Sequence, residues 1–98
     1  MPLKPNQVRH LRALAHHLKP VVLLGQHGLT EAVMAEIELA LEHHELIKVR
    51  VPGMEREDKK DAIEVICERT GAELVQSIGH IAVLFRKRAK DSQISLPR

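Results

Sequence analysis

The chain has 98 residues and a mass of 11.1 kDa, a size that favours one domain with a single modest core. Hydrophobic residues make up 44% and charged residues 29%, a globular composition that excludes a disordered chain. The net charge of +2 conceals an uneven distribution. Residues 1–29 hold four Lys or Arg and no acid, residues 30–47 hold five Glu and no Lys or Arg, and residues 74–98 hold five bases against one acid. If the basic ends meet in space, they form a surface for a polyanion.

Three absences exclude further classes of protein. Phe85 is the only residue of the Phe, Tyr and Trp group, so the chain cannot build an aromatic platform for stacking bases. Cys67 is the only cysteine, which excludes an intramolecular disulfide and a cysteine-based zinc site. No apolar run approaches the roughly 20 residues of a membrane helix, and the polar, basic start resembles no signal peptide. We therefore expect a protein of the reducing cytoplasm, with no membrane association and no cofactor.

The first predicted element is an amphipathic helix over residues 6–18. Its apolar positions follow one helical stripe, and Pro20 forbids its continuation. The opposite side carries Arg9, Arg12, His16 and Lys19. This stripe contains no acid, so it is either an ordinary solvated face or a surface for a polyanion.

Residues 20–24 form a continuous apolar run, which predicts a short strand buried on both faces. The run enters a loop from Gly25 to Gly28, and Thr30 is the predicted N-cap of the next helix. Glycines let a backbone approach a ligand closely, and a helix that follows points unpaired N–H groups at the loop. A phosphate lying across such a loop is the clamp of KH domains, although a simple turn also requires glycine.

The second predicted helix ends near His43 and has an apolar inner side. Its exposed sides carry Glu31, Glu38, Glu42 and Glu45. Residues 46–51 then alternate, which predicts a half-buried strand with Lys48 and Arg50 on its open face.

The last part of the chain contains a third helix, from Glu57 to Thr70, that Gly71 ends. Strands at 74–78 and 81–86 follow as a hairpin, with Phe85 in the core on the face of Ile81 and Val83. Residues 87–98 are a basic tail. The element order is α-β-α-β-α-β-β in a single domain over residues 1–98. It predicts a two-layer α/β sandwich with a mixed four-stranded sheet.

Neither catalysis nor metal binding has a strong signal in the sequence. Cys67 falls on the inward side of the third helix, and the acids follow helix surfaces rather than inward-facing apolar positions. Adjacent histidines, such as His43 and His44, point about 100° apart on a helix and match no zinc-binding spacing. We expect no enzyme and no metal site.

Three strings carry a resemblance to a known family: Leu-Lys-Pro-Val-Val-Leu-Leu-Gly-Gln-His-Gly-Leu-Thr at 18–30, His-Glu-Leu-Ile-Lys-Val at 44–49, and Ile-Gly with Val-Leu-Phe-Arg at 78–79 and 83–86. Together they make the chain similar to bacterial YhbY-type proteins, which are stand-alone CRM domains (chloroplast RNA splicing and ribosome maturation). The resemblance spans nearly the whole chain. It implies a fold similar to the C-terminal domain of translation initiation factor three. It also implies binding of RNA and association with precursors of the large ribosomal subunit.

The resemblance also implies site residues, which join those that the patterns indicate. The family's loop falls on Gly25, Gln26, His27 and Gly28, and its basic surface on Arg9, Arg12, Lys19 and Arg86. The patterns add Thr30, His16, Lys48 and Arg50. Phe85 stands where relatives often have Tyr, which removes a hydroxyl but not the packing.

We therefore expect a non-enzymatic, monomeric protein that binds ribosomal RNA during assembly of the large subunit. An alternative from a different functional class is that the chain is a protein-interaction module whose acidic second helix docks a basic ribosomal protein. A metal-dependent enzyme or sensor is a third and weaker hypothesis.

Overall fold

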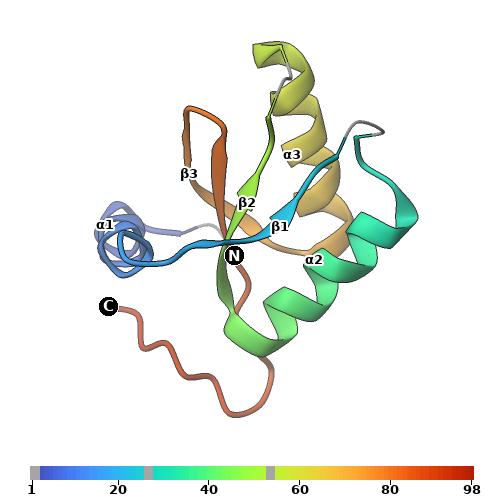
Figure 1. Ribbon diagram of the computed structural model, residues 1–98. Coiled ribbons are helices and arrows are strands. Elements are labelled where there is room, and N and C mark those ends of the chain that lie inside the picture. The colour runs from blue at the N-terminus through green and yellow to red at the C-terminus, as the bar shows by residue number, and fades with distance from the viewer. Residues whose placement is uncertain (1–2, 26–27, 53–54) are drawn as a thin grey trace.

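The computed structural model describes residues 3–25, 28–52 and 55–98. Its elements follow the predicted order: α1 (Pro5–Ala15), β1 (Pro20–Leu23), α2 (Glu31–His44), β2 (Leu46–Arg50), α3 (Arg56–Thr70), β3 (Glu73–Ile78) and β4 (Ile81–Phe85). The strands form one sheet in the order β1-β2-β4-β3 (Figure 1). β1 runs parallel to β2, and the two other pairs are antiparallel. The predicted α/β class and mixed four-stranded sheet are therefore confirmed.

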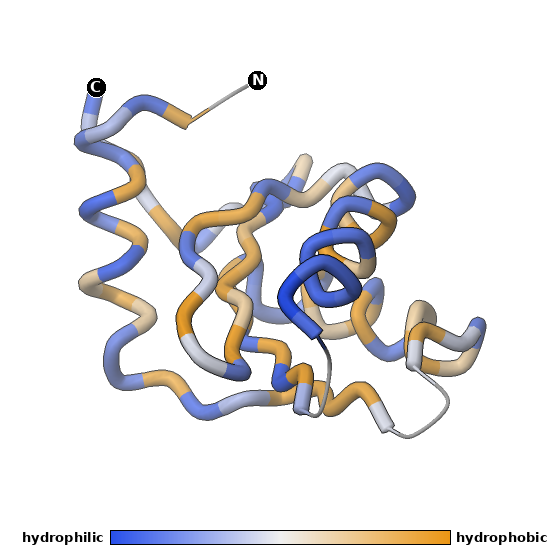
Figure 2. The backbone as a smooth tube through the Cα atoms, turned by 90° about the horizontal axis from the view of Figure 1, so that it is seen from above, coloured by the Kyte–Doolittle hydropathy of each residue, from blue (hydrophilic) through white to orange (hydrophobic). Residues whose placement is uncertain are grey.

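Helices cover both faces of this sheet. α2 and α3 lie on one face over the larger core, which includes Ile37, Ile47, Ile66 and Leu84. α1 lies on the opposite face, so it adds a layer to the predicted sandwich (Figures 1 and 2). Its Leu11 packs in a second cluster with Phe85, which is 4% exposed. The prediction that the only aromatic residue belongs to the core is therefore correct.

Local signals set several helix ends as expected. The Thr30 Oγ1 accepts a hydrogen bond from the Val33 backbone N–H at 3.2 Å, which confirms the predicted N-cap of α2. Gly71 ends α3 in the left-handed conformation, with φ of 75°. α1 ends at Ala15 rather than at residue 18, because the chain must turn there to enter the sheet at Pro20.

The prediction that residues 20–24 are buried on both faces is wrong. β1 is an edge strand, and its face on the α1 side is open: Val21 is 50% exposed and Leu23 is 56% exposed. Val22 and Leu24 point into the larger core instead. A continuous apolar run is typical of a strand covered on both sides, but α1 does not extend over this edge.

The basic tail is packed rather than loose. Ile94 and Leu96 cover the second core cluster, and the Asn6 side chain donates a hydrogen bond to the Arg98 carbonyl at 3.0 Å. Figure 2 shows the end of the chain returning to the start of α1. The tail therefore forms part of the layer on the α1 face.

Glu45 holds this tail by hydrogen bonds. Its burial shows that the prediction that Glu31, Glu38, Glu42 and Glu45 all lie on exposed sides of the second helix is wrong for Glu45. The side chain is 1% exposed and lies directly after α2, with φ of 63°. Its carboxylate accepts hydrogen bonds from the Arg88 and Gln93 backbone N–H groups and from the Ser92 hydroxyl. A buried charge is tolerated here because several donors from the tail replace its water.

Candidate nucleic-acid interface

The glycine loop lies between β1 and α2. The Gly28 N–H donates to the Gly25 carbonyl at 3.0 Å, and Gly28 has φ of 69°, a conformation that side chains with a Cβ rarely adopt. Gln26 and His27, which the resemblance places in the site, lie outside the described residues. Apart from its neighbours in the chain, no atom of the described residues lies within 4 Å of the position where a Cβ of Gly25 would stand. The turn therefore explains the glycine at 28, whereas the described residues leave room for a side chain at 25.

Three connections between elements meet where the strands end, at the top of Figure 1, rather than along an edge strand. The Leu24 N–H donates to the Arg50 carbonyl at 2.9 Å, which places the glycine loop beside the end of β2. The Val51 N–H donates to the His80 carbonyl at 2.6 Å, which places the β3–β4 turn on the other side. We call this the loop edge: the glycine loop, residues 50–52 and the turn at 79–80.

Basic side chains from distant parts of the chain meet on the α1 face. Arg12 of α1 and His16, directly after it, line a hollow of about 210 Å³ with Lys48 of β2. Ile78 and Ile81 of the hairpin form its other side. The hollow therefore reaches toward the loop edge.

Lys48 also holds this surface together. Its Nζ donates to the Leu18 carbonyl at 2.9 Å, which ties the segment after α1 to β2. An ammonium group has three donors, so this bond leaves others for a ligand. None of the residues in α1, β1, β2 and β4 is Asp or Glu, so no carboxylate from these elements neutralises the cations.

The other predicted cations lie around this hollow rather than in it. Arg9 is exposed on α1, and Arg50 is exposed at the end of β2. Lys19 lines a separate groove of about 420 Å³ beside Leu18 and the edge strand. Together they extend the basic surface along α1 and toward the glycine loop.

The structure does not bring Arg86 to this surface. The residue follows β4 at the end of the sheet away from the loop edge, and its side chain is only 20% exposed. Its Nη1 donates to Glu38 at 2.7 Å and to the Thr70 carbonyl at 2.9 Å, and its Nη2 donates to Glu42 at 3.0 Å. The guanidinium thus joins α2 to the end of α3.

The acids of α2 are largely engaged within the chain. Glu31 pairs with Arg69 at 2.9 Å, Glu38 and Glu42 pair with Arg86, and Glu45 is buried. The hydrogen bond and the charge of Arg69 lower the pKa of Glu31. These pairs reduce the negative charge that the helix offers to a basic partner, which weakens the alternative of an acidic docking helix.

The described ranges show little of the chemistry of a metal site or a nucleophile. Within 3–25, 28–52 and 55–98, no three His, Cys, Asp or Glu side chains gather to hold a metal ion. Over the same ranges, no helix has the length and apolar character needed to cross a bilayer. Burial, and secondarily the charge of Glu73, raise the pKa of the Cys67 thiol, which favours the protonated form over the nucleophilic thiolate.

Sequence reasoning missed a second group of basic side chains at the loop edge. Arg56 and Lys60 of α3 and His80 of the hairpin turn line a groove on the α2–α3 face of the sheet. The four-residue spacing of Arg56 and Lys60 places both on one side of a helix, and this spacing was visible in the sequence. Their meeting with His80 depends on the fold.

Comparisons with known proteins identify the family of the chain. The family model of the CRS1/YhbY (CRM) domain matches residues 3–86. A Haemophilus influenzae protein named RNA-binding protein is 55% identical over 96 residues, covering 98% of this chain and 96% of that protein. The Bacillus subtilis protein YqeI, named a probable RNA-binding protein, is 40% identical over 95 residues, covering 97% of this chain and 99% of that protein.

A solved structure has the same fold as this chain. The solution structure of a hypothetical protein from Staphylococcus aureus matches with a TM-score of 0.84 at 40% identity, covering 98% of this chain and 100% of that one. The family match, the similar relatives and the shared fold all extend over nearly the whole chain. The chain therefore belongs to the CRS1/YhbY (CRM) domain family.

Proposed function

We propose that the chain binds RNA through its α1 surface, defined as Arg12, His16 and Lys48 with Arg9, Lys19 and Arg50 around them. One observation carries the proposal: Arg12 and His16 meet Lys48, from a distant strand, around one hollow, and neither α1 nor β2 contains an Asp or Glu. Cations without carboxylate neighbours attract the phosphates of a nucleic acid. The names of the relatives from Haemophilus influenzae and Bacillus subtilis support RNA as the ligand.

The glycine loop and the start of α2 form the second part of the proposed interface. Thr30 accepts from the Val33 N–H, while other N–H groups of the first turn remain available to an anion. In this proposal a phosphate lies against Gly25 and Gly28, and Gln26 and His27 contact the same strand. Arg86 is left out of the interface because its guanidinium is paired with Glu38 and Glu42.

The proposed target is ribosomal RNA in precursors of the large subunit, bound by a monomer in the cytoplasm. With no Tyr or Trp and a buried Phe85, recognition relies on backbone and shape rather than on base stacking by aromatic side chains. Arg and His side chains supply any stacking on bases.

The test measures equilibrium binding of ribosomal RNA fragments over a range of salt concentrations. Log affinity is expected to fall linearly with log salt, and R12A with K48A to reduce the slope by about 0.7 to 0.9 per lost phosphate contact. Arg86→Ala serves as the control for a cation outside the interface. Binding that does not respond to salt, or an Arg12→Ala variant with wild-type affinity, contradicts the proposal.

A further inference from the structure

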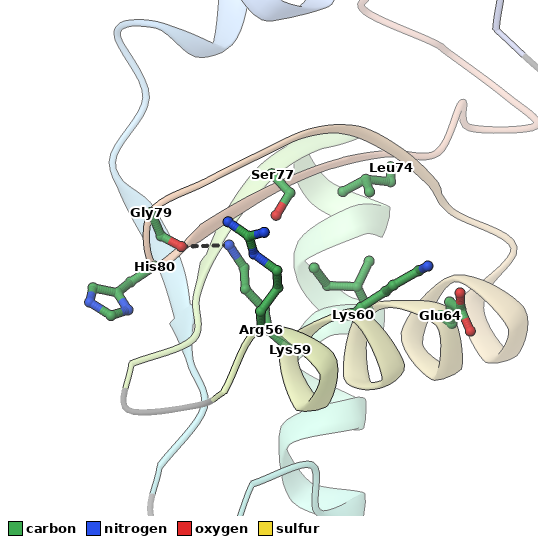
Figure 3. A pocket seen from close by; sticks show the side chains of 9 residues that line it. Arg56, Lys59, Lys60, Glu64, Leu74, Ser77, Gly79 and His80 are labelled. Atoms are coloured by element: carbon green, nitrogen blue, oxygen red, sulfur yellow. Dashed lines mark hydrogen bonds between the residues drawn. The ribbon is translucent and has the colours of Figure 1, made fainter.

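A groove of about 650 Å³ lies between the start of α3 and the β3–β4 hairpin (Figure 3). It belongs to the opposite face of the hairpin from the α1 surface. Leu74 and Ser77 of β3 line this groove, whereas Gln76 and Ile78 of the same strand line the hollow beside α1. A single two-stranded hairpin therefore separates two basic hollows.

Lys59 sets the shape of the groove. Its Nζ donates to the Gly79 carbonyl at 2.6 Å and to the Ile81 carbonyl at 3.3 Å, joining α3 to the hairpin turn. These two hydrogen bonds use the ammonium group within the fold, and burial lowers the pKa of Lys59. Lys59 is thus a structural residue, and the groove needs other side chains to bind a ligand.

Arg56, Lys60 and His80 are those side chains, and all three are exposed. In Figure 3, the Arg56 guanidinium reaches toward Ser77 of the hairpin, Lys60 extends along the groove, and His80 lies beyond Gly79. Glu64 is the one acid of the lining, at the end of the groove where Lys60 points. Arg56 and Lys60 therefore bring two positive charges to the rim against the one negative charge of Glu64.

The lining of the groove matches the chemistry of a nucleotide chain. Ile63 and the 44% exposed Leu74 give it an apolar wall, and Ser77 adds a hydroxyl. Phosphates need the cations of the rim, and a ribose packs on apolar side chains while its hydroxyls find polar partners. The volume falls within the range of about 300–1,000 Å³ that is usual for small-ligand sites.

We propose that this groove, the α3 groove, binds a second stretch of the same RNA strand as the α1 surface. The inference rests on the proposed function and extends it. The turn at 79–80 lies at the loop edge, so a single strand that crosses the turn contacts the cations of both faces. The protein then holds RNA across the tip of the hairpin rather than on one face of the sheet.

The experiment compares the double variant R56A and K60A with wild type on two single-stranded RNAs. The short RNA covers only the α1 surface, and the long one also spans the hairpin tip. Both residues are exposed, so we expect the variant to keep its Tm. On the long RNA the slope of log affinity against log salt is expected to fall by about 1.4, at about 0.7 per lost contact to a single strand. On the short RNA the slope is expected not to change.

A matched control removes two exposed cations elsewhere. The double variant K87A and K90A has the same charge change, and its sites lie at the start of the tail, beyond the other end of β4. If it reduces the slope as much as R56A with K60A, the effect is one of net charge and the inference is overturned. The second measurement is NMR of the unaltered protein. The amide signals of Ser77 and Leu74 are expected to change their chemical shifts when the long RNA is added, but not when the short RNA is added.

The outcomes also separate the inference from the proposed function. If wild type binds the long RNA and R12A with K48A weakens it, while R56A with K60A has no effect, only the α3 groove is refuted. If R12A with K48A binds like wild type, the proposed function fails whatever the groove does.

Discussion

Replacing Glu45 should release the C-terminal tail. The carboxylate Oε1 accepts from the Gln93 N–H at 2.6 Å, and Oε2 accepts from the Arg88 N–H at 3.0 Å and the Ser92 hydroxyl at 2.7 Å. The Arg88 Nε is buried without a hydrogen-bond partner and lies 3.9 Å from the same carboxylate. Glu45→Ala therefore leaves the Arg88 and Gln93 N–H groups without this acceptor, takes the shorter of two hydrogen bonds from the Ser92 hydroxyl, and removes the carboxylate beside the buried Arg88 Nε.

The size of the effect follows from the burial of the group. Removing one member of a buried charged network costs about 3–5 kcal/mol, because the partners stay buried without compensation. A domain of about 100 residues loses about 4–8 °C of Tm per kcal/mol, so a loss of at least about 12 °C is expected if the tail stays in place. If the tail instead detaches in the variant, the Tm is expected to fall by less. Trypsin is then expected to cleave the tail at Lys87, Arg88 and Lys90.

The same contact predicts a dependence on pH. Burial alone raises the pKa of Glu45, but the hydrogen bonds from Arg88, Ser92, Gln93 and Ile94 outweigh it, and the pKa lies below its ordinary value of 4.5. The stabilisation is therefore complete above about pH 4.5 and is lost as the pH falls through the pKa of the folded protein. Protection of the tail is expected to decline in acid.

The assay combines thermal unfolding with limited trypsin digestion and amide exchange at Gln93, for Glu45→Ala, Glu45→Gln and the exposed control Glu36→Gln. Gln keeps the size of the side chain but places an NH₂ group among donors, so an intermediate effect is expected. If both Glu45 variants match the control in Tm and in cleavage of the tail, the reasoning is refuted.

Four further predictions concern the interface and the pairs around it. Arg12→Ala is expected to weaken binding of all RNA sequences alike and to reduce the salt slope by about 0.7 to 0.9, as measured by titration at several salt concentrations. Arg86→Ala is expected to lower the free energy of unfolding by about 1.5–3 kcal/mol, from the lost charged hydrogen bonds, with an unchanged salt slope. Gly28→Val is expected to cost about 1–3 kcal/mol, because φ of 69° strains a β-branched residue, and to weaken RNA binding of the folded variant. Gly25→Ala places its Cβ more than 4 Å from every described residue beyond its neighbours, so an unchanged Tm with weaker binding is expected; unchanged binding would mean that no phosphate approaches this glycine closely.

Much of the fold could be predicted because its signals are local. Thr30 caps α2 through a residue three positions away, and Gly71 ends α3 through its own backbone conformation. The alternation of β2 put Lys48 and Val49 on opposite faces, as predicted, but the face of Lys48 is not open, because α1 packs on Leu46 there. In each of these cases the deciding contact lies within a turn of helix or a pair of strand positions.

The candidate site could be predicted in part for the same reason. The helical spacing of Arg12 and His16 put both on the polar side of α1, and the structure adds Lys48 to the same hollow. The α3 groove was missed because periodicity does not tell which helix start will face which hairpin. The second basic hollow lies where Lys59 joins α3 to the turn at Gly79, a contact between residues 20 positions apart.

By itself, the sequence determined the element order, the α/β class, the place of its single aromatic residue in the core and the acid-free stripe of α1. Only the tertiary structure decided which charges are free. Arg86 resembles Arg12 in the sequence, yet it is held by acids 44 and 48 residues away. Glu45 resembles the exposed acids before it, yet a tail 43 to 48 residues away buries it. The physical reason is that burial and pairing of a charge depend on partners distant in the chain, which local patterns do not specify.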